Sequence, residues 1–113
     1  MITLKEKLLA LRASVPSETV DVPGVGQVEV RGLTAAGRDE WESRLFNGRA
    51  KNLRNVRASM VALCVYDNGA RVFDPTDVEA MGEMPASVID RLYDVAMRLS
   101  GIGTSDSEKL EGN

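Results

Sequence analysis

Apolar residues recur along this chain with two different periods, which divide it into helices and strands. At the start, leucines three and four residues apart predict an amphipathic helix over residues 4–13. Thr3 and Glu6 have the spacing of a capping box at its beginning. Pro16 is expected to end it, because the residue before a proline is pushed out of helical geometry. The apolar stripe of this helix consists of Leu4, Leu8 and Leu11.

The next segment has a period of two. The runs "TVDV" and "QVEV" alternate valine with polar residues, and Pro23, Gly24 and Gly26 lie between them. This pattern predicts a β-hairpin with one apolar face and one face in solvent. An isolated hairpin is marginally stable in water, so the apolar face has to pack within the domain or against a neighbouring copy. That face consists of Val20, Val22, Val28 and Val30.

The rest of the chain returns to helical spacing, with a turn signal in the middle. Thr34 and Asp74 belong to the residue types that cap the starts of helices. The sequence "DNG" at 67–69 predicts a turn before a short strand. The expected elements are helices over 35–46, 53–64, 75–82 and 86–100, and a strand over 71–73.

Together these elements define an α+β fold that is mainly helical: an N-terminal helix, a β-hairpin, then four helices with a short strand and turn. A chain of 113 residues suffices for one domain, which we expect over residues 1–103. Area scaling gives roughly 65% burial of the unfolded surface, so the margin over conformational entropy is thin. Burying a face against further copies would add stability. Residues 104–113 are polar, and we expect a disordered tail there.

Residue types that carry catalysis are scarce. The chain has no histidine, which removes the commonest general base and metal ligand. Its one cysteine, Cys64, lies in the apolar run "MVALCVY" and is interpreted as a buried thiol rather than a nucleophile. Asp74, Asp77 and Glu79 lack the spacing of a calcium loop and suit the first turn of a helix instead. We therefore predict no catalytic, cofactor-binding or metal-binding residues and no enzymatic activity.

No membrane partner is expected either. No stretch approaches the roughly 20 apolar residues that a membrane span needs. The opening leucines alternate with charged residues, unlike the apolar core of a signal peptide. A single cysteine allows no internal disulfide, which fits a reducing cytoplasm.

Charge is distributed unevenly along the chain. Residues 1–57 hold ten Lys and Arg against seven Asp and Glu (+3), whereas residues 58–113 hold four against ten (−6). This asymmetry favours head-to-tail contact between identical chains, although two solvated faces would also account for it. A basic cluster could contact phosphates, yet Trp41 and Phe46 suit a core better than a base-stacking surface, so nucleic acid is not the expected partner. The cluster consists of Arg44, Arg49, Lys51, Arg54 and Arg57.

Three stretches follow one another in an order that can be compared with known families. They are "LKEKLLALR", "ETVDVPGVGQVEVRGLTAAGRDEWE" and "NLRNVRASMVALCVYDNGARVFDPTDVEAMGEMPASVIDRLYDVAMRLSGI". They contain a hairpin, then "LT", a helix with acids and an aromatic residue, an arginine-bearing helix running into "ALC", the "DNGARVF" turn and a final "RLxxxAxRLxG" helix. In this succession the chain resembles the tail assembly chaperones of long-tailed (siphophage-type) bacteriophages, over about residues 4–102.

The resemblance implies a non-catalytic, self-associating chaperone of the host cell cytoplasm that is absent from the mature virion. Members of this family bind the tape-measure protein, keep it soluble and recruit tail-tube protein around it. They form spiral or ring-like homo-oligomers and use no cofactor. In this chain the candidate self-association or client surface joins the leucine stripe to the valine face: Leu4, Leu8, Leu11, Val20, Val22, Val28 and Val30.

The last residues, "LEGN", bear on a further property of the family. Its members are often made in two lengths, the longer by a backward ribosomal slip near the end of the gene. Glu-Gly-Asn can be encoded with a slippery heptamer, and an incidental polar tail is the alternative interpretation. A frameshift-extended form of this chain is therefore a candidate partner.

Two other functions stay open at the level of sequence. Another small phage part, such as a tail-completion or head–tail connector protein, would share the helices and the hairpin but remain in the mature particle. A small nucleic-acid-binding regulator would use the basic cluster and bind DNA with a steep salt dependence.

Overall fold

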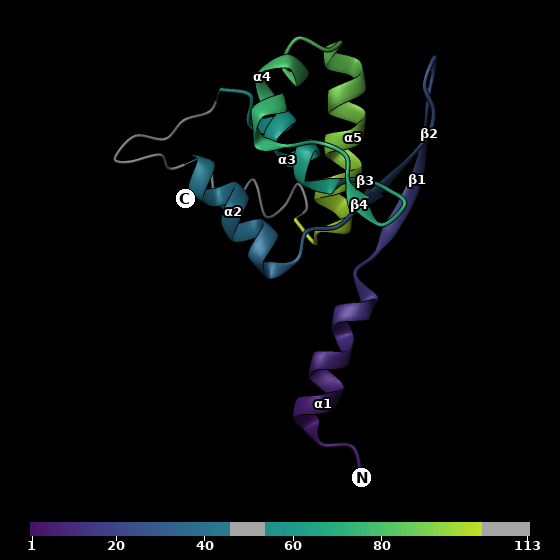
Figure 1. Ribbon diagram of the computed structural model, residues 1–113, viewed down its shortest axis with the longest axis vertical. Coiled ribbons are helices and arrows are strands. Elements are labelled where there is room, and N and C mark those ends of the chain that lie inside the picture. The colour runs from purple at the N-terminus through teal and green to yellow at the C-terminus, as the bar shows by residue number, and fades with distance from the viewer. Residues whose placement is uncertain (46–53, 103–113) are drawn as a thin grey trace.

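The computed structural model describes residues 1–45 and 54–102 of the chain. An antiparallel sheet of four strands, in the order β1-β2-β3-β4, is accompanied by five α-helices within these residues (Figure 1). The strands are β1 (Ser17–Val22), β2 (Gly26–Arg31), β3 (Val65–Asp67) and β4 (Ala70–Arg71). The helices are α1 (Leu4–Leu9), α2 (Ala35–Leu45), α3 (Val56–Cys64), α4 (Val78–Met81) and α5 (Ala86–Leu99), with 3₁₀ helices η1 (Ala10–Ser14) and η2 (Pro75–Asp77).

This architecture confirms the predicted α+β fold class. The N-terminal helix, the hairpin and four later helices occur in the expected order, with the short strands β3 and β4 between α3 and α4. The predicted tail at 104–113 lies outside the described residues.

The β1–β2 hairpin has the register that its valines require. Val20 lies opposite Val28, and Val22 opposite Gly26, so the apolar side chains share one face of the ribbon. Gly24 and Gly26 have φ values of 83° and 110°, a conformation that glycine adopts without steric cost. The predicted hairpin, with its turn at the glycines and its valines on one face, is confirmed.

A second, shorter hairpin joins β3 to β4. Asn68 and Gly69 have φ values of 50° and 82°, as a two-residue type I′ turn requires. Pairing starts directly after this turn, with Ala70 opposite Asp67, so β4 covers 70–71 rather than the predicted 71–73. The prediction was wrong at the far end because Phe73 leaves the ladder and packs against the core.

The core lies between α3, α5 and the valine face of the sheet. Every residue of α3 from Ala58 to Cys64 is buried, which makes this helix the central element of the fold. α5 packs along α3 and across β1 and β2. The side chains with the least exposure are Val30, Met60, Val61 and Cys64.

Helix ends follow the predicted caps in most places. Thr3 Oγ1 accepts a hydrogen bond from the Glu6 backbone N–H at 3.1 Å, and Thr34 Oγ1 accepts one from the Gly37 N–H at 3.0 Å. A capping box joins Asp74 and Asp77 at the start of η2. These bonds satisfy backbone donors that a helix start leaves without partners.

Three helices differ from the prediction. The helix expected over 4–13 is α-helical only over Leu4–Leu9 and continues as the 3₁₀ helix η1 over Ala10–Ser14. The helix expected over 53–64 starts at Val56, because Asn55 takes the left-handed conformation (φ 55°) and cannot continue a helix backwards. The helix expected over 75–82 opens as the 3₁₀ turn η2 and becomes α-helical only at Val78. A short 3₁₀ turn is a common way for a helix to begin.

Candidate interaction surface

The leucine stripe of α1 and η1 lies in solvent. Leu4, Leu8 and Leu11 are 72%, 57% and 59% exposed, and no residue of α1 or η1 is buried. Figure 1 shows α1 extending away from the sheet and the other helices, beyond the start of β1. The structure therefore places the three predicted leucines together on an unpartnered helix.

The valine face of the hairpin, unlike the leucine stripe, is mostly buried. Val20, Val22 and Val30 are buried in the chain's own core, and Val28 is half-buried. α5 covers this face, since it contacts both β1 and β2. Of the two alternatives for the valine face, the structure selects packing within the domain. Val20, Val22 and Val30 are therefore not available to a partner, and the predicted surface was wrong at these three positions.

An apolar groove of about 770 Å³ opens at the turn end of the hairpin. It lies between that turn, β3, the segment after β4 and the beginning of α5. Val25 and Val72 line it and are 74% and 49% exposed. Half-buried apolar side chains form much of the remaining wall: Val28, Phe73, Met84 and Val88.

The sequence alone did not indicate this groove, except for Val22 and Val28, which line it and belong to the predicted valine face. Val25 sits inside a turn and Val72 follows a two-residue strand, so neither belongs to a periodic apolar run. The available signal was a large apolar residue at a turn position, where polar residues are usual. The fold alone brings these two valines to one groove.

The charged side chains that line the groove are acidic, and one of them is paired with an arginine beside it. Glu29 and Asp67 line it, and no lysine or arginine does. Glu29 accepts a hydrogen bond from Arg31 Nε at 2.9 Å, and Arg31 lies over the Tyr66 ring at 4.4 Å from its centroid. Within the described residues no ion pair involves Asp67. The groove is therefore apolar at its centre and acidic at its margin.

The candidate basic cluster is largely neutralised by carboxylates. Arg44 pairs with Glu40 at 3.3 Å. Two further pairs, Arg54–Glu79 at 3.1 Å and Arg57–Asp90 at 2.7 Å, join the region around the start of α3 to α4 and α5.

The same pairing determines the chemistry of Arg57. Its hydrogen bond to Asp90 raises the pKa of Arg57, so the guanidinium stays charged at any physiological pH. Arg49 and Lys51 lie outside the described residues. Of the arginines that are described, Arg54 and Arg57 link the region around the start of α3 to α4 and α5, whereas Arg44 pairs within α2.

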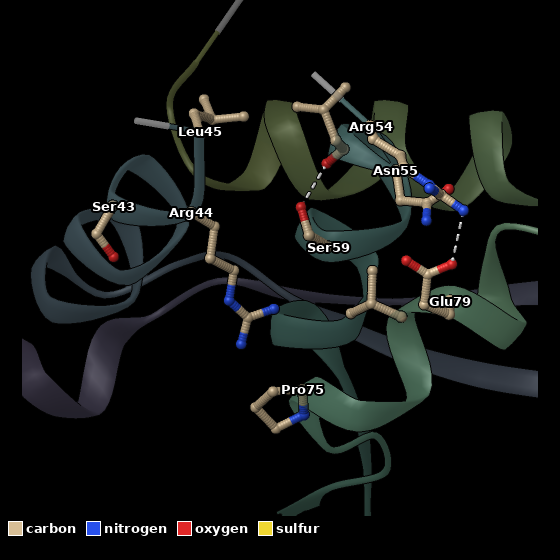
Figure 2. A pocket seen from close by; sticks show the side chains of 10 residues that line it. Ser43, Arg44, Leu45, Arg54, Asn55, Ser59, Pro75 and Glu79 are labelled. Carbon is tan, nitrogen blue, oxygen red and sulfur yellow. Dashed lines mark hydrogen bonds and ion pairs between the residues drawn. The ribbon is translucent and has the colours of Figure 1, made fainter. Parts of the chain in front are cut away.

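A second cavity, of about 400 Å³, lies between the end of α2, the start of α3 and the η2–α4 segment (Figure 2). Figure 2 shows Arg54 bonded to Glu79 on one side of it. Ser59 lies in the same view, with its hydroxyl donating to the Val56 carbonyl at 2.8 Å. Ser43, the other serine that lines this cavity, likewise donates to a backbone carbonyl, that of Glu40 at 2.9 Å, so both hydroxyls are engaged with backbone.

Cys64 is chemically inert in this fold. It is fully buried, and burial raises the pKa of its thiol to about 12. The reactive species of cysteine is the thiolate, which is therefore scarce near neutral pH. The buried thiol was predicted from the sequence, and the structure confirms it.

Two further findings concern only the part of the chain that the structure describes. No three His, Cys, Asp or Glu side chains come together there in a way that could hold a metal ion. No helix there has the length and apolar character needed to cross a membrane.

Comparison of the chain with protein-family models, with curated proteins and with solved structures gave no significant match. The class that the fold and the surface define is a small α+β domain with a projecting amphipathic helix and an apolar groove.

Proposed function

We propose that this chain is a tail assembly chaperone of a long-tailed bacteriophage. In this role it works in the host cytoplasm, binds the tape-measure protein, keeps it soluble and helps to recruit tail-tube protein. It acts as a homo-oligomer, together with a frameshift-extended form of itself, and leaves the particle before completion. The observation that carries the proposal is α1, whose apolar stripe lies in solvent although the chain has a packed core.

A concentration of exposed apolar side chains marks a binding surface, because scattered single residues would need no explanation. α1 and the residues before it present such a concentration: Met1, Ile2, Leu4, Leu8, Leu9 and Leu11. Leu4, Leu8 and Leu11 have the i, i+4, i+7 spacing of helical anchors, which suits a helical partner. The tape-measure protein is long and largely helical, with apolar stripes that are exposed before the tube encloses it.

The work of such a chaperone requires binding and release without a chemical step. A short helix offers a small contact, so a single copy holds its client weakly. Several copies along one client bind much more tightly than one, because each later contact forms at high effective concentration. Removal of copies by incoming tube subunits then needs no reaction. The buried thiol of Cys64 and the carboxylate-paired arginines are in keeping with a binding role.

The proposal expects a long helical tape-measure protein to be encoded beside this chain, and co-expression of the two tests it. We expect that protein to move from the insoluble to the soluble fraction and to co-purify with this chain. A tape-measure protein that stays insoluble with equal amounts of this chain would contradict the proposal. Mass spectrometry of purified virions supplies the second readout, since retention of the chain in mature particles would indicate a tail-completion or connector protein instead.

A further inference from the structure

Two unpartnered apolar surfaces lie at opposite ends of the first strand. α1 and η1 precede Ser17, where β1 begins, and the groove lies at the hairpin turn after Val22, where β1 ends. We propose that the leucine stripe of α1 docks into the groove of a second copy of this chain, so that copies join head to tail. The inference rests on the proposed function, in which copies must gather, and names the surfaces through which they do so.

A copy cannot fill its own groove in this arrangement. A strand of six residues spans roughly 20 Å, and Figure 1 shows α1 pointing away from the hairpin turn. A backbone hydrogen bond of 2.9 Å, from the Gly32 N–H to the Pro16 carbonyl, holds the direction in which the chain passes from η1 into β1. Val15 is extended, with φ −65° and ψ 121°, as a residue before proline prefers. The helix of another copy is therefore the available occupant.

The apolar parts of the two surfaces correspond. The groove volume of about 770 Å³ is within the range of about 300–1,000 Å³ typical of pockets that enclose a ligand. Leu4, Leu8 and Leu11 project from one side of α1 and η1 at intervals of four and three residues, the arrangement by which amphipathic helices bind apolar grooves. On the groove side, Val25 and Val72 are the exposed side chains that such a helix would cover.

The charges correspond as well. The helix carries Lys5, Lys7 and Arg12, with Glu6 as its one acid, whereas the charged residues lining the groove are Asp67 and Glu29, of which Glu29 is already paired with Arg31. No ion pair in the described parts of the chain uses Lys5, Lys7 or Asp67, so these charges are available to a neighbour. A basic helix entering an acidic-rimmed groove is favoured, and a wrongly oriented copy is disfavoured by like charges.

The contact is heterologous, because helix and groove are different patches of the same molecule. Such contacts build rings or open helices rather than stopping at two copies. A single short helix buries less than the 1,200–2,000 Å² or so of a stable complex, so we expect association that grows with concentration. A leucine stripe seated in a neighbour's groove is not free to bind the client, so each stripe serves one of the two partners at a time.

Light scattering on size-separated, full-length protein at several concentrations tests the inference. The helix is altered in Leu8→Asp and the groove in Val25→Asp, both at exposed sites whose substitution leaves the core untouched. Ala10→Asp introduces the same charge on the exposed helix at a position roughly 200° around from Leu8, and Ala36→Asp introduces it on exposed α2. Circular dichroism verifies that all four variants are folded.

We expect the average mass of the wild type and of both controls to rise above two copies with concentration. Leu8→Asp and Val25→Asp are each expected to weaken association at least about tenfold, which corresponds to about 1.4 kcal/mol. Mixing these two variants is the decisive step. The Leu8→Asp copy keeps its groove and the Val25→Asp copy keeps its helix, so the mixture is expected to form pairs and to stop there.

Four results would overturn the inference: a wild type that remains a single copy, a wild type that stops at two, a mixture that stays monomeric, or controls that weaken association as much as the variants do. The assay contains no client. Its failure therefore leaves co-purification with the tape-measure protein unaffected, and the failure of co-purification leaves this assay unaffected.

Discussion

Gly32 faces the backbone of Leu99 so closely that a Cβ on residue 32 would lie 2.8 Å from the Leu99 carbonyl carbon. This contact joins the chain leaving β2 to the end of α5, across most of the sequence. Backbone on both sides leaves no flexible side chain that could move aside. The position therefore requires glycine for reasons of space.

Replacing Gly32 with alanine is expected to destabilise the fold by roughly 3 kcal/mol, the upper end of the cost of overpacking. Urea unfolding measures this change. Gly24→Ala is the matched control: residue 24 has φ 83°, but a Cβ there would meet no atom within 4 Å, so only backbone strain of about 1 kcal/mol is expected. Equal losses at the two positions would contradict the close approach to Leu99.

The Ser100 hydroxyl also links the segment after β2 to the end of α5. Its Oγ accepts from the Leu33 N–H at 2.8 Å and donates to the Ala96 carbonyl at 2.6 Å. Ser100→Ala removes the acceptor and leaves the partly buried Leu33 N–H without its partner, which is expected to cost about 1–3 kcal/mol of unfolding free energy.

Ser43→Ala controls for the loss of a helical serine. Ser43 donates to the Glu40 carbonyl on the exposed part of α2, so its replacement is expected to change stability by less than about 0.5 kcal/mol. A Ser100→Ala variant as stable as Ser43→Ala would show that the junction does not depend on this hydroxyl.

Cys64 makes stability depend on alkaline pH. Its pKa is about 12 in the folded chain against 9.0 for the free side chain, so the folded state holds the thiol proton more tightly. The resulting stabilisation is complete below pH 9 and is lost as pH rises from 9 towards 12, by at most about 1.4 kcal/mol per pH unit. Urea unfolding of wild type and Cys64→Ala at pH 7, 9 and 10.5 measures it.

The alanine variant lacks this titration, so its stability is expected to fall less steeply above pH 9 than that of the wild type. Parallel pH profiles for the two proteins would contradict the shifted pKa. Alkylation provides an independent check, because native protein at pH 8 is expected to react with iodoacetamide only as fast as it unfolds.

Removal of residues 1–14 is expected to leave the folded body intact. No residue of α1 or η1 is buried, so the free energy of unfolding at low micromolar concentration should change by less than about 0.5 kcal/mol. Thermal unfolding of truncated and full-length chains measures the difference. Low concentration is essential, because self-association would stabilise only the full-length protein. A loss above about 1 kcal/mol would mean that the helix packs on the body in solution.

Local signals in the sequence were sufficient for much of this fold. Thr3, Thr34 and Asp74 act at helix starts as their types and spacing predict, because capping involves atoms three residues apart. The hairpin and its valine face were predicted from its glycines and alternating valines for the same reason. Such features depend on neighbours along the chain and are readable without the fold.

Features that depend on segments far apart in the chain could not be predicted from the sequence. Spacing showed that Val20 and Val22 share a face but not that α5 covers it. Arg54 and Arg57 resembled a phosphate-binding cluster because their carboxylate partners stand 25 and 33 positions further on. The left-handed Asn55 lies against Gly82, a contact that only the tertiary structure creates.

β1 pairs with β2 alone and so forms one border of the sheet. A border strand offers its backbone groups to any extended peptide, which is how many proteins begin to form fibrils. Glu18 and Asp21 are exposed on this strand; Glu18 is paired with Arg98 at 2.7 Å, whereas Asp21 has no ion pair within the described residues. A second β1 stacked beside this strand would bring Asp21 carboxylates close together, and their repulsion opposes strand-by-strand polymerisation into fibrils.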